Sequence, residues 1–413
     1  MNKRHGRNVQ AGEECAVHGL WWVAEAPDCK VSGILTYSST SGIRLALSAD
    51  PLEHLGMSYS QRELRWHRQE NIILGNSDDG SDHFTVIDAV AVSISTKLLV
   101  SADGVPTQTA GEMLFLANHV LRGEYNVPNA QAATFTTVSL EVDHLEAWAG
   151  GPGLAQVVRS DPFSPETLFT FETETGRYEL TAWGAPFFRE RESGTRYTCS
   201  VFGKWLEPIM LEGLMRELEK LLSLLTLLFG DQARPRVLRV QEHDDAAPLE
   251  LIAIFTKRHD GNPTHCDMPM PLCNLAERAS AVFSKWFGEW DLLSHTVAML
   301  LTACSTPFAT ATFLLLANAV EAFHRATQDD GLLPDEDFQR WREALSAGLP
   351  NGLPPKLREK LLGDIDHANE CNLRARLKVL LLEVLKISKK GTLTASGTVP
   401  RDSSSLWSKL GTA

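Results

Sequence analysis

The chain has 413 residues, of which 43% are hydrophobic and 22% are charged, as in an ordinary globular protein. Its length allows two or three domains with full-sized cores. The formal net charge of −13 argues against binding of nucleic acid by bulk charge, so RNA contact would require a local basic surface. Seven scattered cysteines without a C-x-x-C pair, and apolar runs broken by polar residues, favour a cytoplasmic protein without membrane contact.

The first half of the chain is predicted to be rich in β-strands. Short apolar runs with a period close to two, separated by turn residues, continue from about Trp21 to Leu206. A short helix is expected at 142–149, and a longer amphipathic helix follows Pro208 and ends at Gly230. The predicted strands are 20–25, 31–37, 42–48, 71–75, 83–95, 112–117, 133–142, 168–173, 177–183, 236–240 and 249–255.

The second half is predicted to be helical. The segment 259–271, rich in Pro, Gly, Asn and Asp, marks the best domain boundary. The fold class is therefore α+β, with a large, mostly antiparallel β-rich domain at 1–265, an all-α helical bundle at 266–390 and a disordered tail at 391–413. The predicted helices of the bundle are 275–303, 306–327, 335–347, 356–363 and 369–387.

The second of these helices has a distinct first half. Thr306 is a candidate N-cap before Pro307 at the first helical position. The residues of 308–317 are apolar or small on every side, which is typical of a helix buried among other helices.

Its second half carries polar residues along one stripe. Asn318, Glu321 and Arg325 recur at spacings of three and four, and His324 lies beside them. This stripe has two interpretations. It is either a site at the mouth of the bundle, or the solvent-exposed end of the helix, on which Glu321 and Arg325 form a surface pair.

Several stretches together resemble one protein family. Their order and spacing are similar to those of the ApeA family of bacterial anti-phage proteins, in which a β-rich N-terminal domain precedes a C-terminal HEPN domain. The resemblance covers about residues 15–385. The stretches that carry it are 19–28 (Gly-Leu-Trp-Trp-Val-Ala-Glu-Ala-Pro-Asp), 31–37, 139–148, 313–325 with its Val-Glu-Ala-Phe-His-Arg ending, and 367–378.

The resemblance implies a ribonuclease that acts in abortive infection. The β-rich domain would respond to a phage-derived trigger, and the helical domain would cut RNA, with tRNA as one candidate, without a metal or other cofactor. HEPN nucleases commonly act as homodimers and use an Arg-x(4–6)-His motif near the start of the last helix. In that motif the arginine holds the scissile phosphate, and the histidine moves a proton near neutral pH.

The helical half departs from this pattern. Its histidines are His295, His324 and His367, and none follows an arginine at the required spacing. The catalytic residues therefore stay unassigned, and we expect this chain to be inactive, through truncation, a shifted reading frame or natural loss of the motif. Three pairs with matching spacing lie in or beside the β-rich half and are attributed to chance: Arg62 with His67, Arg236 with His243, and Arg258 with His265.

Five side chains are the candidate RNA-binding residues: Glu321, His324, Arg325, Arg374 and Arg376. They would line an RNA cleft, with Glu321 orienting an arginine. The charge balance turns basic from Lys356 onward, which is typical of either a phosphate-facing patch or a solvated helix surface. The alternative function is a non-enzymatic sensor that binds RNA or protein and dimerises through the helical bundle.

Two further groups have less specific patterns. The pair Trp21-Trp22 could stack on a ligand, but neighbours in a strand face opposite sides, so core packing of one of them is the better explanation. Four side chains lie close enough in the sequence to be considered as zinc ligands: His259, His265, Cys266 and Cys273. Their spacing matches no standard zinc site, so we expect no metal.

Overall fold

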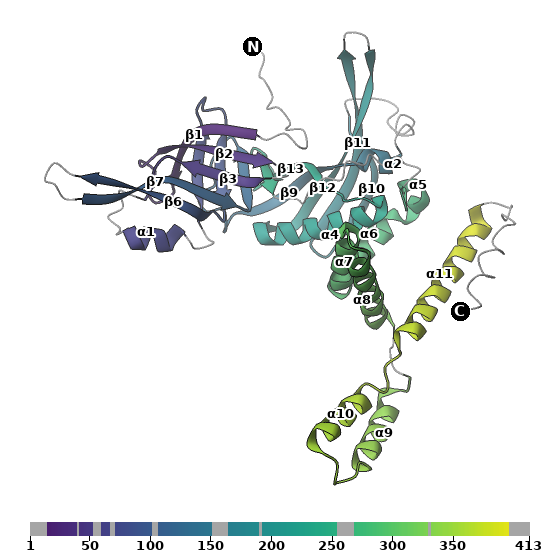
Figure 1. Cartoon of the computed structure of the whole chain (residues 1–413). Coiled ribbons are helices and arrows are strands. Elements are labelled where there is room, and N and C mark those ends of the chain that lie inside the picture. The colour runs from purple at the N-terminus through teal and green to yellow at the C-terminus, as the bar shows by residue number, and fades with distance from the viewer. Residues whose placement is uncertain are drawn as a thin grey trace. The chain divides into compact units, whose positions relative to one another are not determined.

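A computed structural model of the chain describes residues 15–38, 41–52, 59–66, 71–100, 106–150, 164–189, 192–253, 268–328 and 332–395. The chain divides into two compact units, which we call the β-rich unit (1–288) and the helical unit (289–413). Figure 1 shows the elements of each unit, most of them labelled.

In the described part of the β-rich unit, fourteen strands form one antiparallel sheet. Their order is β10-β11-β12-β9-β13-β14-β8-β5-β4-β1-β2-β3-β7-β6. The strands are β1 (Cys15–Val23), β2 (Val31–Ser38), β3 (Gly42–Leu47), β4 (Ile73–Ser77), β5 (His83–Ile87), β6 (Val90–Val100), β7 (Pro106–Ala117), β8 (His119–Gly123), β9 (Thr134–Val142), β10 (Glu166–Glu172), β11 (Gly176–Arg189), β12 (Glu192–Met210), β13 (Pro235–Gln241) and β14 (Leu249–Ala253).

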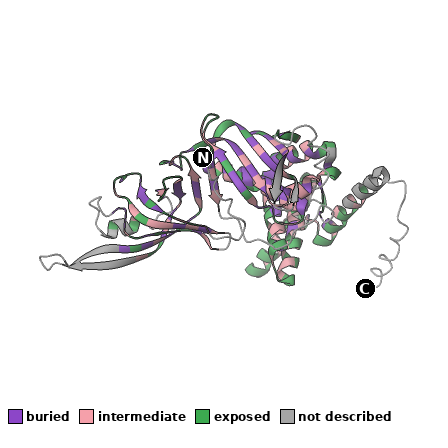
Figure 2. Cartoon of the chain, turned by 90° about the horizontal axis from the view of Figure 1, so that it is seen from above, coloured by how far each residue is buried: buried purple, intermediate pink, exposed green. Residues whose placement is uncertain are grey.

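The predicted alternation is clear in β3. Ile43, Leu45 and Leu47 are buried, whereas Arg44 and Ala46 between them are exposed, as expected when successive side chains point to opposite faces. Figure 2 shows the same concentration of buried residues along the strands of the sheet.

The first hydrophobic core lies against strands β1 to β8. Trp66, at the end of α1 (Tyr59–Trp66), is buried in it and donates a hydrogen bond from Nε1 to Asp50 Oδ1 at 3.1 Å. Trp21 and Trp22 are both buried, so their role in packing is confirmed, whereas the expectation that only one faces protein is wrong. Lys30 lies over the ring of Trp22, with Nζ 4.5 Å from the ring centroid.

The second core lies where helices cover the other half of the sheet. The predicted amphipathic helix is α4 (Leu211–Phe229), which buries an apolar stripe and ends at Gly230 with φ of 71°. The short helix is α2 (Leu145–Ala149), whose Leu145 and Trp148 are buried in the same core.

The prediction of a single helix at 275–303 is wrong, because this stretch is divided into several shorter elements. It forms α5 (Leu272–Leu275), a 3-10 turn (Ala276–Arg278), α6 (Ala279–Gly288) and α7 (Trp290–Ser305). On α6, Phe283 packs on Phe171 with 5.0 Å between ring centroids, and Phe287 packs on Tyr178 at 5.3 Å. These contacts with β10 and β11 keep α6 in the β-rich unit, so the compact units divide at Gly288 rather than at the predicted residue 265.

The helical unit contains α7, α8 (Ala309–Thr327), α9 (Asp335–Ala347), α10 (Pro355–Asp366) and α11 (Leu373–Ala395). The predicted start of α8 at Thr306 is wrong, because Thr306 ends α7 and its Oγ1 donates a hydrogen bond to Thr302 O at 2.6 Å. Phe308 precedes α8 in extended conformation. Pro334 occupies the N-cap position of α9.

The apolar first half of α8 is not buried as predicted. The exposed fractions of Phe313 and Leu314 are 69% and 55%, and that of Phe308, which precedes the helix, is 72%. The described part of α11 extends to Ala395, beyond the predicted start of the tail at 391, and residues 396–413 lie outside the described residues.

The α+β fold class is confirmed by the antiparallel sheet and the helices that follow it. Within the described ranges, no helix combines the length and the apolar character that a membrane crossing requires.

Candidate functional site

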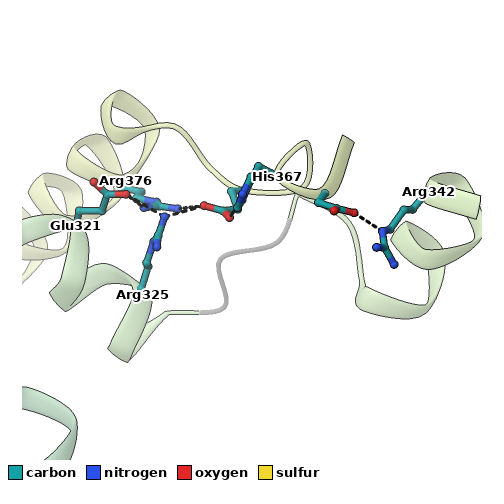
Figure 3. A network of polar contacts seen from close by, with 7 residues as sticks. Glu321, Arg325, Arg342, His367 and Arg376 are labelled. Carbon is teal, nitrogen blue, oxygen red and sulfur yellow. Dashed lines mark hydrogen bonds and ion pairs between the residues drawn. The ribbon is translucent and has the colours of Figure 1, made fainter. Parts of the chain in front are cut away.

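The polar stripe of α8 meets α11 within the helical unit (Figure 3). Glu321 and Arg325 form an ion pair one turn apart, with 3.1 Å between Oε1 and Nη2. Glu321 Oε1 also accepts a hydrogen bond from Arg376 Nη1 of α11 at 2.6 Å. Glu321 therefore orients two arginines, and the stripe joins two helices in addition to forming the expected pair.

Arg376 is the buried centre of this arrangement, with a side chain only 1% exposed. Its Nη2 lies 3.5 Å from Glu370 Oε2, so two carboxylates compensate the buried guanidinium. A guanidinium removed from water requires such partners, because an uncompensated charge would strongly destabilise the fold. Arg376 is thus held between α8 and the segment that precedes α11.

Glu370 contacts the side chains of two arginines and one histidine. One oxygen, Oε2, accepts a hydrogen bond from Arg325 Nη2 at 2.7 Å, and Oε1 lies 2.6 Å from His367 Nδ1. Figure 3 shows Arg325, Arg376 and His367 converging on this region. We call the five residues Glu321, Arg325, His367, Glu370 and Arg376 the Glu370 cluster.

The carboxylate determines the protonation pattern of the imidazole. An ionised carboxylate can only accept hydrogen bonds, so Nδ1 of His367 carries the proton. The His367 side chain is 75% exposed. The hydrogen bond from His367, together with the charges of Arg325 and Arg376, lowers the pKa of Glu370 below its ordinary value.

The loop that carries Glu370 is fixed by Asn369. The Asn369 side chain accepts a hydrogen bond from Leu333 N at 2.8 Å and donates one to Leu333 O at 3.0 Å. The backbone carbonyl of Asn369 accepts a further hydrogen bond, from Leu332 N. Asn372 then caps α11, because its Oδ1 accepts a hydrogen bond from Ala375 N at 3.0 Å.

The structure places the five predicted RNA-binding residues in different environments. Glu321, Arg325 and Arg376 come together in the Glu370 cluster. His324 is buried on α8, with an exposed fraction of 3%. Arg374 is exposed on the first turn of α11. Contact of these residues with RNA stays a prediction.

Two residues of the cluster, His367 and Glu370, are not among the predicted site residues. Their sequence signal is weak, since it consists of a histidine followed three positions later by a glutamate, just before the Asn372 cap. Only the folded chain brings them beside Arg325, which lies far away in the sequence.

The other candidate sites are less well defined by the structure. Among the described residues, no three His, Cys, Asp or Glu side chains are placed to hold a metal ion. Cys273 is exposed on α5, whereas the other three candidate zinc ligands, His259, His265 and Cys266, lie outside the described residues.

Two family profiles match the chain. The profile of ApeA N-terminal domain 1 matches residues 16–286, and that of Apea-like HEPN matches residues 314–405. The first match ends within α6, which packs with the sheet. No characterised protein and no solved structure gives a significant match to the chain. Because the first profile covers more than half of the chain, and a HEPN profile follows it, the chain belongs to the ApeA family of anti-phage defence proteins.

Proposed function

We propose that the helical unit of this HEPN-type defence protein holds RNA by its phosphates, and that the β-rich unit responds to a phage-derived trigger. The observation that carries the RNA proposal is the division of α11 into two sides. Arg376 is buried in the Glu370 cluster, whereas Arg374 and Lys378, four residues apart on one face, are exposed.

The charges of the cluster itself support an accessory role for it. Glu321 and Glu370 balance Arg325 and Arg376, so these four side chains together have little net attraction for a phosphate. Attraction would instead come from Arg374 and Lys378, and from the exposed His367 when it is protonated. The cluster fixes α11 so that these cations keep a constant spacing.

An RNA-binding titration at several salt concentrations tests this proposal. Replacement of Arg374 and Lys378 by alanine is expected to weaken binding and to reduce the slope of log K against log salt by roughly 0.7 for each lost phosphate contact. Arg340→Ala is the matched control, because Arg340 is 75% exposed and already paired with Asp337 at 2.8 Å. An unchanged slope in the double variant would contradict RNA binding by α11.

One observation favours a second function, which is metal-independent cleavage of RNA. Glu370 holds the Nδ1 proton of His367, which leaves Nε2 available for proton transfer, and the same carboxylate binds Arg325. The first proposal expects no cleavage, because the helical half lacks the Arg-x(4–6)-His motif. Degradation of RNA in the presence of a chelator, abolished by His367→Ala but retained in Arg340→Ala, would support the second function instead.

A further inference from the structure

Trp341 on α9 differs from the other tryptophans that the structure describes. The exposed fraction of its side chain is 61%, whereas Trp21, Trp66 and Trp148 are at most 1% exposed. The remaining described tryptophans are buried or half-buried. Because an indole ring removes a large apolar area from water when it is covered, an exposed one is a common anchor of binding surfaces.

The helix pair α9 and α10 does not use this ring as part of a core, because neither helix contains a buried residue. The residues beside Trp341 form ion pairs instead. Arg340 Nη2 lies 2.8 Å from Asp337 Oδ1, and Arg342 Nε lies 2.5 Å from Asp366 Oδ1 at the end of α10. The indole ring is therefore accessible to a molecule from outside the helix pair.

The ion pair between Arg342 and Asp366 links α9 to the Glu370 cluster. Asp366 directly precedes His367 in the chain, and His367 Nδ1 lies 2.6 Å from Glu370 Oε1. These contacts form one polar network within the helical unit (Figure 3). Trp341 directly precedes Arg342, so the exposed ring is tied to the part of the helical unit for which RNA binding is proposed.

We propose that Trp341 stacks on an unpaired base of a bound RNA. This inference rests on the proposed RNA binding and adds a base contact to the phosphate contacts of Arg374 and Lys378. Aromatic side chains stack on the bases of single-stranded RNA with little sequence preference, because every base has a π-face. The first turn of α9 is acidic and repels phosphates, so a base rather than the RNA backbone meets this helix.

Two short RNA probes test the stacking: an oligoadenylate, and an abasic oligoribonucleotide of the same length. Both probes carry the same phosphates, but only the first has bases. The unmodified full chain is expected to bind the oligoadenylate about tenfold more tightly than the abasic probe. Trp341→Leu is expected to lose most of this preference, because leucine is apolar but has no ring that can stack.

Two further variants separate stacking from other effects. Trp341→Phe is expected to keep most of the preference for the oligoadenylate, because a phenyl ring can also stack. Phe313→Ala is the matched control, since it removes an aromatic ring that is 69% exposed on α8, and it is expected to leave the preference unchanged. Trp341→Leu alters no charge, so the dependence of its remaining affinity on salt is expected to stay the same.

The outcomes distinguish failure of this inference from failure of the proposed function. Equal affinity of the unmodified chain for both probes, or a full preference in Trp341→Leu, would overturn stacking by Trp341 even where Arg374 and Lys378 contact phosphates. A chain that binds neither probe would overturn both proposals. If Trp341→Leu loses its helix content by circular dichroism, photocrosslinking of the oligoadenylate to the unmodified chain decides. A crosslink at Trp341 supports the inference, and crosslinks at other residues alone contradict it.

Discussion

At the scale of single residues, Arg376 has the most demanding environment in the helical unit. Its guanidinium is almost completely buried, whereas Glu321 and Glu370 are each about one-third exposed. The two carboxylates compensate the charge, and the segments that carry them come from α8 and from the loop before α11. Removal of the arginine would leave Arg325 as the cation that Glu321 and Glu370 share, so the contribution of Arg376 lies in holding α8, α11 and the loop before α11 together.

Arg376→Ala is therefore expected to lower the free energy of opening of α11 by about 2 kcal/mol, less than for a fully buried pair because water reaches both carboxylates. Amide hydrogen exchange along α11 measures this change. Arg340→Ala, at an exposed pair on α9, is expected to change stability by less than about 0.5 kcal/mol. Equal effects of the two substitutions would show that burial of Arg376 contributes nothing.

Glu370 makes the stability of the helical unit sensitive to acid. Because the pKa of Glu370 is lowered in the folded state by His367, Arg325 and Arg376, its ionised form stabilises the fold above the ordinary value of 4.5. This stabilisation is lost as the pH falls from 4.5 through the lowered pKa. Thermal unfolding between pH 7 and pH 3 is expected to show a loss of stability in that window.

The Glu370→Gln variant is expected to be less stable than the unmodified chain at pH 7 and to show a shallower loss below pH 4.5. Glu359→Gln, at an exposed position of α10, serves as the control. Parallel curves for the unmodified chain and Glu370→Gln would rule out this carboxylate as the source of the acid sensitivity.

At the scale of secondary-structure elements, α6 differs most from its predicted role. Its aromatic side chains pack on β10 and β11, and Trp286 donates a hydrogen bond from Nε1 to Lys220 O of α4 at 2.9 Å. These contacts make α6 part of the second core, although its sequence resembles that of the helices that follow it. The helix ends at Gly288, where the β-rich unit also ends.

Phe283→Ala is expected to destabilise the β-rich unit by about 3–5 kcal/mol, because the side chain is 2% exposed and its removal leaves a cavity among aromatic rings. Urea unfolding followed by circular dichroism measures the loss. Phe313→Ala provides the matched control on α8, where the ring is 69% exposed, and is expected to change stability by less than about 0.5 kcal/mol.

At the scale of the whole molecule, the chain consists of two units with unequal packing. The β-rich unit has two cores with many fully buried side chains, whereas α9 and α10 contain no buried residue. The β-rich unit is thus built to fold independently.

A fragment of residues 1–288 is expected to unfold cooperatively, whereas a fragment of residues 1–265 is not. The shorter fragment lacks five buried side chains of the second core: Met268, Leu275, Ala279, Phe283 and Phe287. Limited proteolysis and thermal unfolding of the two fragments distinguish them. Equal stability of the fragments would place the boundary of the folding unit at the Pro- and Gly-rich segment predicted from the sequence.

The sequence by itself determined the features that depend on local periodicity. The alternation of strands such as β3, the apolar stripe and glycine end of α4, and the change from strands to helices all follow from spacing along the chain. The stripe of Glu321 and Arg325 was also visible, because residues three and four apart share a helix face.

Only the tertiary structure decided which partners these elements meet. The burial of Arg376, the role of Glu370 and the proximity of His367 to Arg325 depend on contacts between α8, α11 and the loop before α11. The assignment of α6 to the sheet depends in the same way on aromatic rings far apart in the sequence. Periodicity shows which face of an element is apolar or charged. It does not show which element packs against that face, because packing joins residues that are distant along the chain.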